Sequence, residues 1–126
     1  MFYKILILLC LATIAVKGQN SDGISIRENY TKLDTMIAMR DGIKLYTVIY
    51  IPKDAGQKFP ILMERTPYSS APYGKDNYSR RIGPNMQLAK EKYIFVYQDV
   101  RGRYMSEGEF EDVRPFNKNK TGKQYD

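Results

Sequence analysis

One tyrosine of the chain, Tyr68, lies where its hydroxyl could act as a hydrogen-bond donor in a reaction. Tyr68 ends the segment 65–68 (RTPY), which follows a short apolar run at residues 60–64. Pro67 fixes its own φ and restricts the residue before it, so the phenol of Tyr68 is presented in a defined direction. At the end of a buried strand, such a phenol can donate a hydrogen bond to a developing oxyanion. Its spacing alone favours the other interpretation, in which the ring packs against the rim of a sheet, and leaves both open.

A second segment, residues 98–108, follows the most strand-like run of the chain, at residues 93–100. Its charged residues Asp99 and Arg101 can form a charge-assisted pair, and Gly102 permits backbone angles that other residues resist. We expect this segment to brace a loop rather than to hold a catalytic pair.

The residue types that are missing exclude several kinds of site. The chain has no histidine and a single cysteine, Cys10. A Ser-His-Asp site, an intramolecular disulfide and a thiolate zinc site therefore cannot be completed within these residues. The serines lack a Gly-x-Ser-x-Gly elbow, and the acids that follow Asp99 lack the alternating spacing of a calcium loop. The sequence predicts no metal and no cofactor.

Residues 1–18 have the pattern of a secretory signal peptide. Lys4 precedes an apolar run at residues 5–16, and small residues precede an expected cleavage after Gly18. As a helix this run rises about 18 Å, short of the roughly 30 Å hydrocarbon core, so no stable membrane anchor is expected. The signal predicts export to the periplasm or the extracellular medium.

The charge of the chain is positive but dispersed. The net charge of +6 becomes +4 without Lys4 and Lys17, and the remaining basic residues are spread along the sequence. Nucleic-acid binding uses a clustered basic stripe, so no nucleic-acid partner is expected. Residues 19–30 are polar and are expected to be a linker.

Hydrophobic patterning predicts an α/β fold. Alternation at residues 31–39 and 43–51, around an Asp-Gly turn, predicts a β-hairpin. Residues 60–64 predict a strand covered on both faces, residues 85–92 a short helix, and residues 93–100 another strand. This order of elements is typical of the first part of a mixed sheet, and we expect residues 93–100 to form its uncovered edge.

Three motifs, taken in order, carry a family resemblance: residues 39–45 (MRDGIKL), 65–68 (RTPY), and 98–102 (QDVRG) with 106–110 (SEGEF). Together they resemble the N-terminal part of the X-prolyl dipeptidyl-peptidase-like family of α/β-hydrolases, which includes cocaine esterases and α-amino-acid ester hydrolases. The resemblance covers about residues 31–115. It implies that residues 31–126 are the N-terminal portion of a catalytic domain, an incomplete mixed sheet that ends before the nucleophile elbow.

The same resemblance implies a serine hydrolase that acts through an acyl-enzyme on small-molecule esters, amides or peptides. Tyr68 matches the tyrosine whose hydroxyl, with a backbone N–H, forms the oxyanion hole. Asp99, Arg101 and Gly102 match the loop that braces the active-site floor. The serine, acid and histidine of such enzymes lie further along, so this chain alone is expected to be inactive.

A second interpretation is a small exported β-rich binding module. In that case Tyr46, Tyr50, Tyr73 and Tyr78 would form its contact surface.

Overall fold

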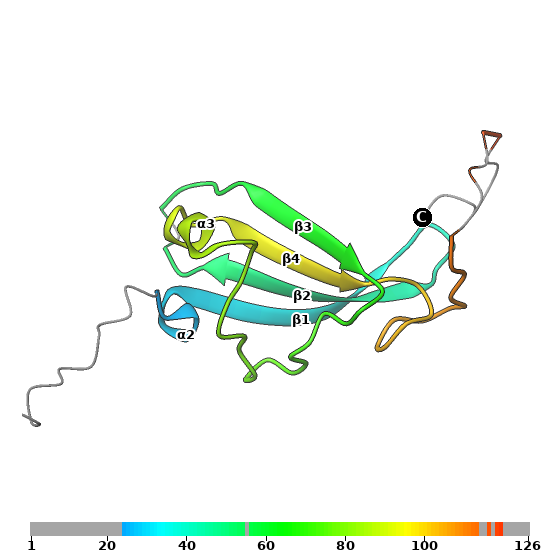
Figure 1. The fold of residues 1–126 in the computed structure, drawn as a ribbon, viewed down its shortest axis with the longest axis horizontal. Coiled ribbons are helices and arrows are strands. Elements are labelled where there is room, and N and C mark those ends of the chain that lie inside the picture. Colours follow the sequence, from blue (N-terminus) through cyan, green and yellow to red (C-terminus); the bar gives the residue numbers. More distant parts are fainter. Residues whose placement is uncertain (1–23, 55, 114–115, 117, 120–126) are drawn as a thin grey trace, which may run out of the picture.

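The computed structural model describes residues 24–54, 56–113, 116, 118 and 119. The expected signal peptide, residues 1–18, lies outside the described residues. Figure 1 shows a four-stranded sheet in the order β1-β2-β4-β3 with two short helices at one end. In chain order the elements are α2 (Ile26–Asn29), β1 (Tyr30–Ala38), β2 (Lys44–Pro52), β3 (Ile61–Thr66), α3 (Met86–Lys90) and β4 (Ile94–Asp99).

The predicted hairpin is confirmed. β1 and β2 pair antiparallel from Tyr30 opposite Pro52 to Ala38 opposite Lys44. Its turn uses Gly42 at φ +90°, and the Asp41 carboxylate accepts a hydrogen bond from the Ile43 N–H at 3.1 Å. The mixed sheet is confirmed as well, because β4 pairs antiparallel with β2 and parallel with β3.

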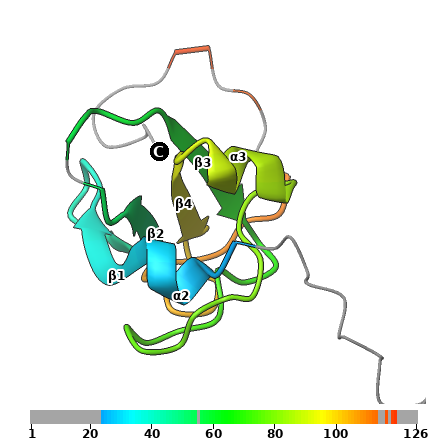
Figure 2. The same cartoon turned by 90° about the vertical axis from the view of Figure 1, so that its left-hand side faces the viewer.

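The core lies on one face of the sheet. α2, α3 and the long connection between β3 and α3 cover this face, as Figure 2 shows from the helix end. The buried side chains are Ile26, Tyr30, Val48, Tyr50, Ile82, Ala89 and Phe95. The predicted helix is present as α3, where the Asn85 side chain accepts a hydrogen bond from the Leu88 N–H at 3.2 Å.

Residues 24–30, expected as part of a linker, instead belong to the fold. Ile26 and Tyr30 are 3% and 1% exposed, and the Tyr30 hydroxyl donates to the Ala89 carbonyl at 2.9 Å. Ile24 also packs against the core, and the polar residues between these three apolar ones hid their contribution.

Much of the other face of the sheet, here called the open face, is exposed among the described residues, although Leu45, Thr47 and Gln98 on it are buried. Two expectations are corrected. β3 is not covered on both faces, since Ile61 is 66% and Met63 47% exposed. β4 is not an edge, because the crossover through α3 places it between β2 and β3. On β1, Leu33 lies on this open face at 46% exposure. No helix among the described residues is long and apolar enough to cross a membrane.

Candidate active site

Tyr68 lies just beyond the carboxyl end of β3. β3 and β4 run parallel and end side by side, with Thr66 opposite Asp99, so the loops that follow them share one edge of the sheet. The Tyr68 N–H donates to the Thr66 Oγ1 at 3.0 Å, which fixes the backbone where the residue leaves the strand. The side chain is 82% exposed. Of the two interpretations from sequence, packing against the sheet rim does not fit this exposure.

The backbone that follows Tyr68 is held in an uncommon conformation. Ser69 has φ +92°, a value that costs a non-glycine residue about 1–3 kcal/mol. The Ser69 Oγ accepts from the Ala71 N–H at 3.1 Å, and the Ser70 N–H donates to the Asp99 carboxylate at 2.6 Å. These contacts keep Ser69 in place and so restrict the direction of Tyr68.

Asp99 joins the loops after β3 and β4. Its side chain is fully buried and accepts hydrogen bonds from the Ser70 N–H, the Tyr73 hydroxyl at 2.9 Å and the Met105 N–H at 3.3 Å. Its carbonyl accepts from the Ser106 hydroxyl at 2.7 Å. Burial, together with the hydrogen bond to Asp99, raises the pKa of Tyr73 and keeps it a donor. Asp99 thus accepts hydrogen bonds from the loop after β3 and from the loop after β4.

The expected pair between Asp99 and Arg101 is not the one that the structure forms. Arg101 pairs with Asp41 in the hairpin turn, with 2.8 Å between Nη1 and Oδ2. The hydrogen bond from Arg101 holds the pKa of Asp41 below its usual range. The Asp99 carboxylate is instead satisfied by neutral N–H and O–H donors. Arg101 therefore ties the loop after β4 to the turn between β1 and β2.

Gly102 lies where this loop doubles back on itself. It has φ +68°, and its N–H donates to the Glu107 carbonyl at 3.0 Å. A Cβ at this position would lie 2.1 Å from the backbone nitrogen of Phe110. The residue must be glycine for both reasons, the backbone angle and the close approach of another backbone segment.

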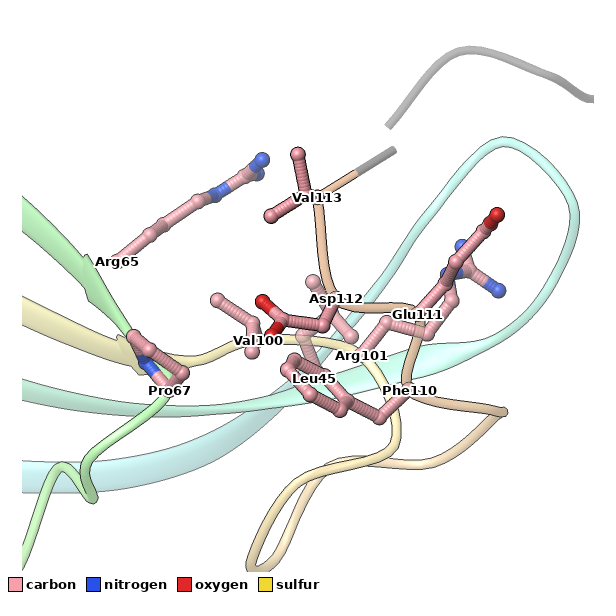
Figure 3. Close-up of a pocket in the computed structure, with 9 residues that line it drawn as sticks. All are labelled: Leu45, Arg65, Pro67, Val100, Arg101, Phe110, Glu111, Asp112 and Val113. Atoms are coloured by element: carbon pink, nitrogen blue, oxygen red, sulfur yellow. The ribbon is translucent and has the colours of Figure 1, made fainter. Parts of the chain in front are cut away.

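A cavity of about 270 Å³ opens at the same end of the sheet (Figure 3). It is lined by Leu45, Arg65, Pro67, Val100, Arg101, Phe110, Glu111, Asp112 and Val113. Its lining combines apolar side chains with two arginines and two acids. None of these side chains is a hydroxyl or thiol nucleophile, and Tyr68 does not line it.

The four tyrosines of the binding-module interpretation do not form an outer surface. Tyr50 is 2% exposed, and the other three are half-buried. All four hydroxyls bond within the chain: Tyr46 to Asp34, Tyr50 to Ser79, Tyr73 to Asp99 and Tyr78 to Lys32. Their rings fasten the loop after Tyr68 to the sheet and are not available as a contact surface.

Sequence reasoning missed the ion pair between Lys32 and Asp34 beneath this loop. The Lys32 side chain is fully buried, and its Nζ lies 2.9 Å from the Asp34 carboxylate. A signal was available, because both residues fall on the face of β1 opposite Leu33. Charged residues at alternate positions of a strand usually mark its solvent face, so the pattern by itself predicts exposure of Lys32 and Asp34 rather than burial.

The sheet order and the polar loops at the carboxyl edge of the parallel strands define the chain as an α/β-hydrolase-type protein. Residues 41–124 match the family model described as X-Pro dipeptidyl-peptidase (S15 family). The chain belongs to this family of hydrolases.

Three relatives illustrate the family. Cocaine esterase from Rhodococcus sp. (strain MB1 Bresler) is 35% identical over 77 residues, which cover 61% of this chain and 13% of the esterase. An aminopeptidase from a marine sediment Thaumarchaeota archaeon superposes with a TM-score of 0.59 at 39% identity, covering 75% of this chain and 17% of that one. An α-amino acid ester hydrolase gives a TM-score of 0.57 at 36% identity, covering 81% and 17%. The chain thus spans less than a fifth of the length of these relatives.

Proposed function

We propose that this chain is the N-terminal part of an exported serine hydrolase that cleaves ester or amide bonds of small molecules or peptides. In this proposal a serine attacks the carbonyl carbon, and the oxygen of the tetrahedral intermediate accepts a hydrogen bond from the Tyr68 hydroxyl. Collapse releases the alcohol or amine and leaves an acyl-serine, which water then hydrolyses. The serine and its acid–base partners come from polypeptide beyond the present sequence.

One observation carries the assignment of Tyr68. Its hydroxyl is on an exposed side chain, while the backbone on both sides is fixed by Thr66, by the strained Ser69 and by Asp99. A donor stabilises an oxyanion best when it is already held in place before the charge develops. The substrate class rests on the relatives, whose names include an esterase, an ester hydrolase and an aminopeptidase.

The first experiment is to read the coding DNA downstream of Asp126. The proposal expects the frame to continue into a Gly-x-Ser-x-x-Gly segment. A stop codon directly after Asp126 would contradict it and revive an independent module.

The second experiment measures hydrolysis of a p-nitrophenyl ester. Residues 19–126 alone should match a protein-free blank, since this segment contains no histidine. The longer product should be active, and Tyr68→Phe should lower its kcat by about 10²–10³. Tyr104→Phe is the matched control, because Tyr104 is also exposed, at 53%, on the neighbouring loop. An acyl-enzyme burst from residues 19–126, or equal rates for the two tyrosine variants, would refute the assignment.

Export is tested separately. The mature product should begin at Gln19, which mass spectrometry of the secreted protein determines. Retention of residues 1–18 would contradict the signal-peptide hypothesis.

A further inference from the structure

The Lys32–Asp34 ion pair lies under the loop that follows Tyr68, residues 69–78, in a place where a charge is costly. The Lys32 side chain is fully buried and that of Asp34 is 10% exposed. A buried ion pair seldom stabilises a fold more than apolar side chains of the same volume would. Stability alone therefore gives little reason for this pair, and its contacts suggest another role.

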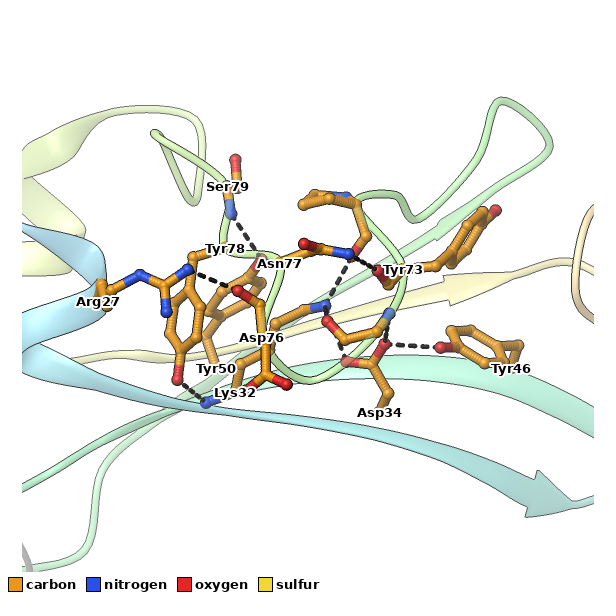
Figure 4. Close-up of polar contacts among 12 residues, drawn as sticks. Arg27, Lys32, Asp34, Tyr46, Tyr50, Tyr73, Asp76, Asn77, Tyr78 and Ser79 are labelled. Carbon is orange, nitrogen blue, oxygen red and sulfur yellow. Dashed lines mark hydrogen bonds and ion pairs between the residues drawn. The ribbon is translucent and has the colours of Figure 1, made fainter.

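The pair holds backbone atoms of the loop rather than side chains (Figure 4). Lys32 Nζ donates to the carbonyls of Pro72 at 2.6 Å and Gly74 at 2.7 Å. Asp34 Oδ2 accepts from the Gly74 N–H at 2.6 Å and from the Tyr46 hydroxyl at 2.6 Å. Gly74 is thus held through both its N–H and its carbonyl, which fixes the far part of the loop on β1.

Two routes lead from this pair to the residue beside Tyr68. One is the short stretch of backbone from Gly74 back to Ser69. The other passes through two rings, because Tyr46 packs edge-on against Tyr73 with centroids 5.2 Å apart. The Tyr73 hydroxyl in turn lies 2.9 Å from the Ser69 Oγ. Ser69, at φ +92°, keeps its strained conformation only while its surroundings determine it.

We propose that Lys32 and Asp34 are positioning residues: by holding the loop at Pro72 and Gly74 they keep Ser69 in place and so set the direction of Tyr68. This inference rests on the proposed function only for the role of Tyr68 as hydrogen-bond donor to the oxyanion. If the loop is released, Tyr68 stays in the chain, but its backbone loses contacts that fix the direction in which the side chain leaves it.

The test uses the full chain and the double variant Lys32→Met/Asp34→Asn, which removes both charges and leaves neither one unpaired. Hydrogen exchange is read at the Ser70 amide, whose acceptor is Asp99 and not the ion pair. The chain is also labelled with 3-fluorotyrosine, and the fluorine resonance of Tyr68 is assigned by Tyr68→Phe. We expect the Ser70 amide to exchange about tenfold faster and the Tyr68 resonance to move toward that of a free peptide. Amides of β2 and β4 should keep their protection.

The matched control is Lys92→Met/Asp54→Asn, which removes a second Lys–Asp pair whose side chains are 46% and 48% exposed. It should leave the Ser70 amide and the Tyr68 resonance unchanged. If the double variant does not fold, Tyr46→Phe removes one hydrogen bond to Asp34 without touching a charge, and it should move both readouts in the same direction by less.

If only the Gly74 amide exchanged faster, while the Ser70 amide and the Tyr68 resonance stayed as in the wild type, the proposal would be overturned. The ion pair would then stabilise only the segment around Gly74. The readouts do not involve hydrolysis. A response of Ser70 and Tyr68 therefore supports the positioning role even where the esterase test contradicts the catalytic role of Tyr68.

Discussion

Gly102 gives a direct measure of how closely the loop after β4 is packed. In Gly102→Ala the new Cβ would lie 2.1 Å from the Phe110 nitrogen and 2.4 Å from the Glu109 carbonyl carbon. The φ of +68° costs an L-residue about 1–2 kcal/mol, and forced overpacking costs a further 1–3 kcal/mol or so. We expect the free energy of unfolding to fall by roughly 2–5 kcal/mol, a large part of the 5–15 kcal/mol typical of a domain.

Gly42→Ala is the matched control, because Gly42 has φ +90° but a Cβ added there would meet no heavy atom within 4 Å. It should cost only the backbone part, about 1–2 kcal/mol. The assay is urea denaturation followed by far-UV circular dichroism, at two protein concentrations so that self-association is detected. Equal losses for the two variants would refute the reasoning, since the close approach of Phe110 would then have no energetic consequence.

Three further outcomes are expected. Burial raises the pKa of Tyr30 to about 12, so its contribution to stability is complete below pH 10 and is lost between pH 10 and 12, where the folded state keeps a proton that the unfolded state has lost. Tyr30 should account for up to roughly 3 kcal/mol of the loss in urea titrations across this range, and Tyr30→Phe should make the slope shallower without removing it, because the pKa values of Tyr46, Tyr50, Tyr73 and Tyr97 are raised as well; an unchanged slope would contradict this prediction. Ile61→Thr/Met63→Lys should reduce self-association, measured by sedimentation velocity, because both side chains are exposed on the open face. Met105→Lys, at an exposed residue outside the sheet, should leave self-association unchanged. Equal sedimentation of the two variants would contradict association through the open face. Asp99→Asn places an amide donor among three donors and should cost about 1–3 kcal/mol; an unchanged urea midpoint would show that Asp99 does not brace the loops.

Local patterns predicted the elements that local chemistry determines. The alternation on either side of Asp41 and Gly42 predicted the hairpin, and that turn is where β1 and β2 are joined. The helix predicted from residue 85 begins beside Asn85, whose side chain caps it. In each case the decisive interaction joins residues at most a few positions apart, so the sequence alone contains it.

Three features of the structure depend on contacts between distant parts of the chain and could not be predicted from local sequence patterns. Alternation on β1 predicts two faces but does not say which one packs, and the covered face contains Lys32 while Leu33 lies on the open one. Arg101 has an acid two positions away, yet it pairs with Asp41 some sixty residues earlier because the loop folds back onto the hairpin turn. The position of β4 likewise follows from a crossover connection, which the linear order of strands does not determine.

The two faces of the sheet have separate consequences for the proposed site. The contacts that fix the backbone around Tyr68 come from the covered face and the carboxyl edge, through Thr66, Asp99 and the Lys32–Asp34 pair. None of these residues lies on the open face, where Met63 projects. A substitution such as Met63→Lys should therefore change self-association while the Ser70 amide keeps its wild-type exchange rate. If Ser70 exchanged faster in that variant, the open face would contribute to holding Tyr68, and the donor side of the site would not be formed by residues 32–106 alone.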